Sequence, residues 1–172
     1  MKWLAVTKSI LDQARRARHG QSLVEFAVVA PMFFLLVFGI TDFGRLFFTK
    51  ETLLFALREA GRYAVTGQKF AGTNPLTQNP YTRVESIRAI AQKFAAGFLP
   101  NSSNIDINAY DSESVLDTAH PAGLPSETVV ISLNTSITLI TPIIGRYFPN
   151  GVYTFTVSTS FKNEPFDVAA AD

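Results

Sequence analysis

The chain has 172 residues, of which 47% are hydrophobic and only 17% charged, and its formal net charge is +1. This length suits one domain with an appendage, and the charged fraction is low for a soluble protein. The absence of cysteine excludes disulfides, thiolate metal sites and a lipid anchor on cysteine. Residues 1–20 carry five basic side chains against one acidic side chain. A basic segment beside an apolar run is a membrane-topology signal, and we expect no nucleic-acid partner.

An apolar run follows the basic segment. No residue from Phe26 to Ile40 is charged, and the helix from Gln21 to Ile40 would be about 30 Å long, enough to cross a lipid bilayer. By the positive-inside rule, residues 1–20 would stay in the cytoplasm and the rest would be exported. Pro31 removes one hydrogen-bond donor, so we expect a kink there, which membrane helices tolerate. The sequence therefore predicts a membrane helix over residues 21–41.

One carboxylate, Glu25, stands at the start of this apolar segment, five positions after Gly20. An ionisable group inside a membrane is expensive, so such a residue usually has a function. In the simpler alternative, the segment is an ordinary single-pass signal anchor, and Gly20 and Glu25 have no special role.

The helical pattern continues beyond the membrane segment. Apolar residues recur near the 3.6-residue period from Phe43 to Ala64, and Gly67 is expected to end the helix. The sequence thus predicts one helix of roughly 45 residues, partly in lipid and partly in water. Ala56, Ala60 and Ala64 form a stripe of small side chains that lets another backbone approach closely. That stripe would pack either against another subunit or against the protein's own sheet.

A second, amphipathic helix is predicted to begin at Thr82, whose spacing to Glu85 gives a capping box, and to stop near Gly97. Its apolar face comprises Val84, Ile87, Ala91, Phe94 and Phe98. The side chains expected to lie largely off that face are Arg83, Ser86, Gln92 and Lys93.

The last third of the chain alternates between apolar and polar residues. Strands are predicted at 105–110, at 129–139 and at 153–161, with a polar loop over 111–126. One apolar face per strand is typical of an antiparallel sheet that helices cover on one side. We therefore expect an α+β head over residues 42–172, in which a small antiparallel sheet packs on amphipathic helices and on the continued N-terminal helix.

The sequence offers little catalytic or metal-binding chemistry. The two histidines are His19 and His120, so paired metal-binding histidines are not expected, and a Ser-His-Asp site would have to use His120. The acidic residues of 106–117 do not match a calcium-binding loop, and a solvated loop is the preferred interpretation. We expect no enzyme activity, no catalytic residues, no metal site and no cofactor.

The connection at residues 141–151 is unusually apolar. Its central part, residues 142–149, could tuck under the sheet edge into the protein's own core or form a surface for a partner. The first alternative is preferred, although the sequence assigns no role to this loop.

The segment around Gly20 and Glu25 resembles the signal of type IV prepilins. This resemblance implies that a membrane-embedded prepilin peptidase cuts between Gly20 and Gln21, which removes residues 1–20 as a leader. Glu25 would then be the fifth residue of the mature chain. Its carboxylate could pair with the new ammonium group of Gln21, on its own chain or on a neighbouring subunit.

Three motifs make the resemblance more specific: Glu25–Pro31, Arg58–Ala64 and Phe161–Pro165. Together they resemble the TadE family, minor pilins or pseudopilins of the tight-adherence (Flp, type IVc) pilus. The resemblance implies a pilin-like fold and a role in cell adhesion. Major Flp pilins are very short, whereas this mature chain would have 152 residues (172 minus 20). A minor subunit is therefore expected.

The resemblance also implies partners and a location. The partners would be the prepilin peptidase, the major Flp pilin, other minor pilins, the inner-membrane assembly platform and the lipid bilayer. The protein would span the bacterial inner membrane once, with its C-terminus in the periplasm, and could enter the extracellular fibre. The alternative is a signal-anchored envelope protein with a periplasmic binding domain and no role in a pilus.

Overall fold

The structure is a computed structural model that describes the backbone of residues 2–99 and 104–167 and the side chains of residues 21–99 and 104–167. Contacts divide the chain into two compact units. Unit 1 comprises the chain up to Phe43 together with Leu139–Gly151, and unit 2 comprises Gly44–Thr138 together with the chain from Val152 on. Each unit is described separately below.

The N-terminal helix α1 spans Lys2–Ala64 and contributes to both units. It continues through Gly20 and through Pro31. Gly67 follows the helix end with a positive φ of 69°, and its amide donates to the carbonyl of Ala64. A left-handed residue just past the last turn is a common way to end a helix, so the predicted end is confirmed.

Unit 2 contains a four-stranded antiparallel sheet in the order β2-β1-β3-β4. The strands are β1 (Ile105–Tyr110), β2 (Leu116–Asp117), β3 (Thr128–Thr138) and β4 (Val152–Lys162). The three strands predicted from the alternating pattern are present. The two-residue strand β2 lies inside the predicted polar loop, because a pairing so short has no periodic signal in the sequence.

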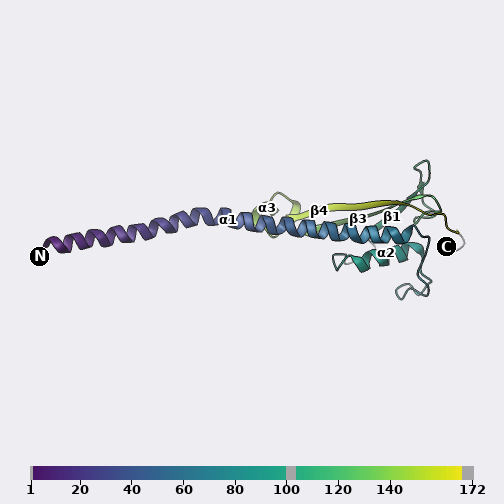
Figure 1. Ribbon diagram of the computed structural model, residues 1–172, viewed down its shortest axis with the longest axis horizontal. Coiled ribbons are helices and arrows are strands. Elements are labelled where there is room, and N and C mark those ends of the chain that lie inside the picture. Colours follow the sequence, from purple (N-terminus) through teal and green to yellow (C-terminus); the bar gives the residue numbers. More distant parts are fainter. Residues whose placement is uncertain (1, 100–103, 168–172) are drawn as a thin grey trace. The chain divides into compact units, whose positions relative to one another are not determined.

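One face of the sheet carries the core of unit 2. Alternate residues of β1 and of the first half of β3, together with Val157 of β4, are buried in a core that also includes α1 and helix α2 (Arg83–Phe94). Figure 1 shows the strands and α2 alongside the second half of α1. Ala56, Ala60 and Ala64 are each at most 1% exposed within this core. The alanine stripe thus packs inside the chain's own core, and the predicted α+β class is confirmed.

Helix α2 has the capping box expected from its sequence. The side chain of Thr82 accepts from the amide of Glu85, and the carboxylate of Glu85 accepts from the amide of Thr82. The prediction that Arg83 and Ser86 lie off the buried face was wrong, since they are 7% and 0% exposed. Both side chains bond backbone groups: the hydroxyl of Ser86 donates to the carbonyl of Thr82 and accepts from the amide of Phe70, and the contacts of Arg83 are described below.

Unit 1 joins the apolar half of α1 to the connection between β3 and β4. This connection contains helix α3 (Pro142–Gly145) and the 3-10 helix η2 (Pro149–Gly151), and it closes through a hydrogen bond from the amide of Leu139 to the carbonyl of Gly151. The preference for a buried loop was wrong: Ile140, Ile143 and Tyr147 are 52%, 54% and 84% exposed. The loop is held by hydrogen bonds, within its backbone and to the side chain of Asp42 described below, while the three side chains named above stay exposed.

Candidate functional site

The residues singled out near the N-terminus lie on one continuous helix. The predicted cleavage position, between Gly20 and Gln21, falls inside α1. One turn later, the carboxylate of Glu25 accepts a hydrogen bond of 3.1 Å from the side-chain amide of Gln21, and both side chains are exposed. This bond brings the carboxylate of Glu25 to the side chain of Gln21, the residue that would become the N-terminus after the predicted cleavage.

The helix surface that follows is apolar and unburied. The segment Gln21–Ala64 contains a stretch long and apolar enough to cross a membrane, and no part of that stretch is buried inside the chain. Large side chains such as Phe26, Met32 and Ile40 are 66–76% exposed. Such a surface is stable in lipid or against other apolar helices, and costly in water. Pro31 lies on the same exposed surface.

Asp42, the first charged residue after Glu25, binds the loop of unit 1. Its carboxylate accepts hydrogen bonds from the amides of Ile140 and Thr141, at 2.9 and 2.8 Å, and from the hydroxyl of Thr141, at 2.7 Å. Asp42 is 5% exposed and Thr141 is 2% exposed. Hydrogen bonds to an ionised carboxylate are about twice as strong as neutral ones. Asp42 therefore fixes the start of α3 against the C-terminal end of the apolar stretch of α1.

The function of Asp42 was missed by sequence reasoning. The available signal was an acidic residue directly after an apolar run. Its partners lie 98 and 99 positions away, however, and no local pattern links them.

At the C-terminal end of α1, two of the sequence motifs, Arg58–Ala64 and Phe161–Pro165, are in contact. Gly61 packs against the ring of Phe161 so closely that an added Cβ would overlap the ring. The amide of Glu164 donates to the carbonyl of Val65 at 3.0 Å. The segment after β4 thereby satisfies a carbonyl that the end of a helix leaves without an intrahelical partner.

The side chain of Asn163 fastens the same segment to a neighbouring loop. Its amide nitrogen donates to the carbonyls of Ala122 and Leu124, at 3.1 and 2.9 Å, and Asn163 is 3% exposed. The segment that follows β4 is therefore an ordered part of unit 2 up to this point and not a loose tail.

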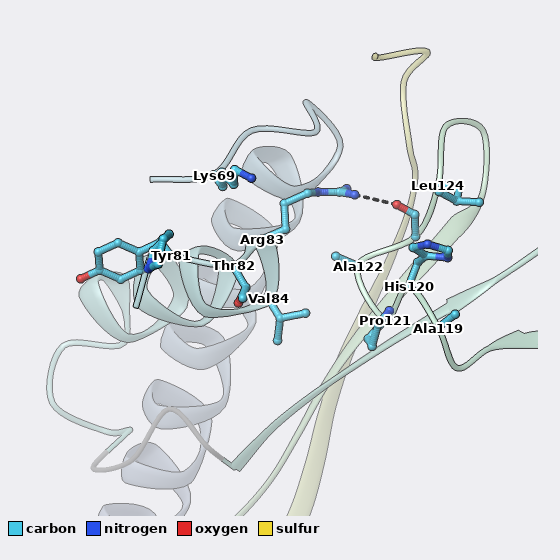
Figure 2. Close-up of a pocket in the computed structure, with 12 residues that line it drawn as sticks. Lys69, Tyr81, Thr82, Arg83, Val84, Ala119, His120, Pro121, Ala122 and Leu124 are labelled. Carbon is cyan, nitrogen blue, oxygen red and sulfur yellow. Dashed lines mark hydrogen bonds between the residues drawn. The ribbon is translucent and has the colours of Figure 1, made fainter. Parts of the chain in front are cut away.

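Arg83 connects α1, α2 and this loop. Its guanidinium donates to the carbonyls of Ala64, at 3.0 Å, and Gly123, at 2.6 Å, and lies 4.7 Å from the centre of the Phe166 ring. Figure 2 shows the first residue of α2 reaching the loop that carries Ala122 and Leu124. A cation at the C-terminal end of α1 also complements the helix dipole. These contacts explain why Arg83 is buried.

An open cavity of about 470 Å³ lies beside Arg83, lined by Lys69, Tyr81 and His120 among others (Figure 2). The polar groups near it serve the fold: Arg83 bonds two carbonyls, and His120 Nδ1 lies 3.0 Å from the carboxylate of Asp117. Arg83 and His120, which line the cavity, are thus engaged in contacts that hold the fold together.

In the polar loop over 111–126, two aspartate side chains bond backbone amides of the loop's own turns. The carboxylate of Asp111 accepts from the amides of Glu113 and Val115, and that of Asp117 accepts from the amides of Ala119 and His120. The bond from the backbone of His120 is the main reason that the pKa of Asp117 is lowered. Among the described residues, no group of three or more acidic, histidine or cysteine side chains could hold a metal ion. These contacts agree with the solvated-loop interpretation.

Comparison with known proteins adds one match. The model of a family described as TadE-like protein matches residues 20–62. The match starts at Gly20 and includes the first motif and most of the second, whereas the motif at Phe161–Pro165 lies outside it. No curated protein and no solved structure matches the chain.

The match links the chain to the tight-adherence pilus, and the exposed apolar helix is consistent with a single membrane anchor. The resemblance predicted from the sequence is thus confirmed: residues 20–62 match the model of the TadE-like family.

Proposed function

We propose that this protein is a minor pilin, or pseudopilin, that supports assembly of a tight-adherence type IVc pilus. The observation that carries the proposal is the family match, which begins at Gly20 and contains Glu25. A prepilin peptidase cuts the chain after Gly20, and the mature protein of 152 residues (172 minus 20) begins at Gln21. Its partners are the peptidase, the major Flp pilin, other minor pilins and the inner-membrane platform.

The arrangement around Glu25 supports a pairing role. Its carboxylate lies within one helical turn of Gln21, and the side-chain amide of Gln21 already donates to it. Cleavage creates an ammonium group on the main-chain nitrogen of the same residue, and a charged donor binds a carboxylate more strongly than a neutral amide does. Pairing within the chain or with a neighbour lowers the cost of a charge at the membrane edge and sets the register between subunits.

Gly20→Val tests the processing step. We expect the chain, expressed in a host with its prepilin peptidase, to lose residues 1–20, and the variant to remain uncut, because a branched side chain does not fit a cleft that takes glycine. N-terminal sequencing and intact mass measure the outcome. Gly44→Val is the matched control, since a Cβ there meets nothing within 4 Å. An uncut wild-type chain, or a cut elsewhere, would refute the proposal.

Glu25→Ala tests the pairing role. We expect membrane insertion to persist, because the apolar helix is unchanged, while pilus formation is lost. Glu51→Ala is the control, since Glu51 is also an exposed carboxylate on α1. Normal numbers of pili in Glu25→Ala cells would show that the carboxylate has no role in assembly.

The second candidate is a signal-anchored envelope protein whose periplasmic domain binds a partner. The exposed apolar loop of unit 1 favours it as a binding surface. Under this candidate, Gly20→Val and Glu25→Ala change neither processing nor any pilus, so the same two variants distinguish the candidates.

A further inference from the structure

The loop of unit 1, residues 139–151, exposes apolar side chains in spite of an ordered backbone. Ile143 sits on α3 and is 54% exposed, and Tyr147 follows that helix and is 84% exposed. The backbone is tied by the bond between Leu139 and Gly151 and by the turn from Ile144 to Tyr147. An ordered loop that keeps apolar groups outward calls for a partner that covers them.

Within unit 1, the loop lies beside the end of the apolar stretch of α1. The Cδ1 atom of Ile144 lies 3.6 Å from the position that a Cβ on Gly39 would take. Asp42 binds the amides of Ile140 and Thr141. The loop is therefore held at the last turns of the apolar stretch of α1, whose side chains are exposed up to Ile40 and Phe43.

The exposed apolar surface of the loop thus continues the exposed apolar surface of α1. Where a membrane helix leaves the hydrocarbon, tyrosine is enriched at the headgroup level, and long basic side chains extend toward the phosphates. Tyr147 and Arg146 are adjacent and both exposed. Their types and positions match this boundary region.

We propose that residues 139–151 form a second membrane contact, in which Ile140, Ile143 and Tyr147 insert into the headgroup region of the bilayer beside α1. Asp42 holds the loop at this depth through its bonds to Ile140 and Thr141. The partner is the lipid surface itself. The contact rests on the membrane anchoring of α1 and is independent of cleavage and of pilus assembly.

The experiment uses the full chain in phosphatidylcholine vesicles whose acyl chains carry bromine, which quenches tryptophan fluorescence at short range. The sequence has one tryptophan, Trp3, so every variant carries Trp3→Phe. Tyr147→Trp then reports on the loop and Phe38→Trp on the apolar stretch of α1. Leu76→Trp is the control, because Leu76 lies in another loop, in unit 2, and is 91% exposed.

We expect bromine close to the headgroups to quench Tyr147→Trp at least about twofold, with a blue-shifted emission, because the ring leaves water for the interface. Bromine at the chain ends should quench Phe38→Trp more strongly than Tyr147→Trp. The control should keep the red emission of a tryptophan in water and show little quenching.

Three results would overturn the proposal. If Phe38→Trp is quenched and Tyr147→Trp is not, the anchor stands and the loop contact is refuted. If Tyr147→Trp shifts to the blue without quenching, and only at high protein density, a second copy covers the loop instead. If Phe38→Trp is not quenched, the anchor fails and the loop contact with it.

Asp42→Asn tests how the loop is held. The substitution keeps the shape of the side chain but removes the charge that three donors share. We expect weaker quenching of Tyr147→Trp and unchanged quenching of Phe38→Trp. Equal quenching of Tyr147→Trp with and without the substitution would overturn the role given to Asp42.

Discussion

Replacing Gly61 with alanine should destabilise the packing of β4 on α1, although alanine is the better helix former. In the structure, a Cβ at Gly61 would overlap the Cε2 and Cδ2 atoms of the Phe161 ring. Phe161 is half-buried and stands opposite Val129 in the pairing of β4 with β3. The ring can make room only by leaving its place or by moving the strand.

Two opposing effects set the magnitude. Alanine in place of glycine inside a helix stabilises it by roughly 0.5–1 kcal/mol. An added methyl group in a packed contact costs roughly 1–3 kcal/mol. The net expectation for Gly61→Ala is a loss of about 1 kcal/mol. Gly44→Ala is the matched control, because nothing lies within 4 Å of its Cβ position, and only the stabilising effect applies.

The assay is hydrogen exchange of the full chain in detergent micelles, read from the amides of β4 and of the second half of α1. The helix preference is common to both alanine variants, so the difference in opening free energy between Gly61→Ala and Gly44→Ala isolates the steric cost, about 1–3 kcal/mol. Adding Phe161→Leu to Gly61→Ala should remove most of that difference. Equal protection in the two alanine variants would refute the close contact.

Three further substitutions probe the junction at the end of α1 and the acidic loop. Arg83→Met should lower stability by roughly 3 kcal/mol, because two buried carbonyls lose a charged donor, with Arg83→Lys intermediate, as chemical denaturation would measure. Asn163→Asp, equal in size, should cost a similar amount, roughly 2–3 kcal/mol, at neutral pH and less in acid, where a protonated carboxyl again donates. The pKa of Asp117 is lowered, so its stabilisation of the loop is present at neutral pH and lost as pH falls through that lowered value. Asp117→Asn should abolish this pH dependence of proteolysis at the loop, and an unchanged dependence would contradict the assignment.

Much of the fold follows from local patterns. The helix from Gln21 onward could be predicted because its period persists while the composition changes from apolar to amphipathic. The capping box of Thr82 and Glu85 involves neighbours only, so the start of α2 needs no tertiary information. The alternation in β1, β3 and β4 reflects a sheet with one buried face.

The errors concern residues whose surroundings come from distant segments. Arg83 was expected to lie largely off the apolar face of α2. Arginine is rarely buried without partners, and the partners of Arg83, Ala64 and Gly123, are contributed by two other elements. The connection at 141–151 was expected in the core because of its apolar composition. Its position depends on Asp42, which no pattern within the loop identifies.

The motif at Gly20 and Glu25 differs from Arg83 and the loop, because its proposed role depends only on residues that are close together in the sequence. A peptidase reads a short, contiguous stretch of chain, so the sequence itself carries the information that the proposed processing needs. Gly61 and Phe161 belong to two different sequence motifs. Only the folded unit shows that these two residues are in contact. The family match includes Gly61 and stops before Phe161.

The two carboxylates that flank the apolar stretch, Glu25 and Asp42, differ in how the chain satisfies them. Glu25 and Asp42 are 17 positions apart, about 26 Å of helix, which is close to the ~30 Å thickness of a hydrocarbon core, so the two carboxylates stand near opposite ends of the apolar stretch. Asp42 is 5% exposed and accepts three hydrogen bonds from its own chain. Glu25 is exposed and accepts a hydrogen bond from the side-chain amide of Gln21. Its exposure leaves the carboxylate accessible to donors from other chains. Asp42 thus holds the loop of unit 1, whereas Glu25 is accessible to the ammonium group that the proposed cleavage would create on its own or a neighbouring chain.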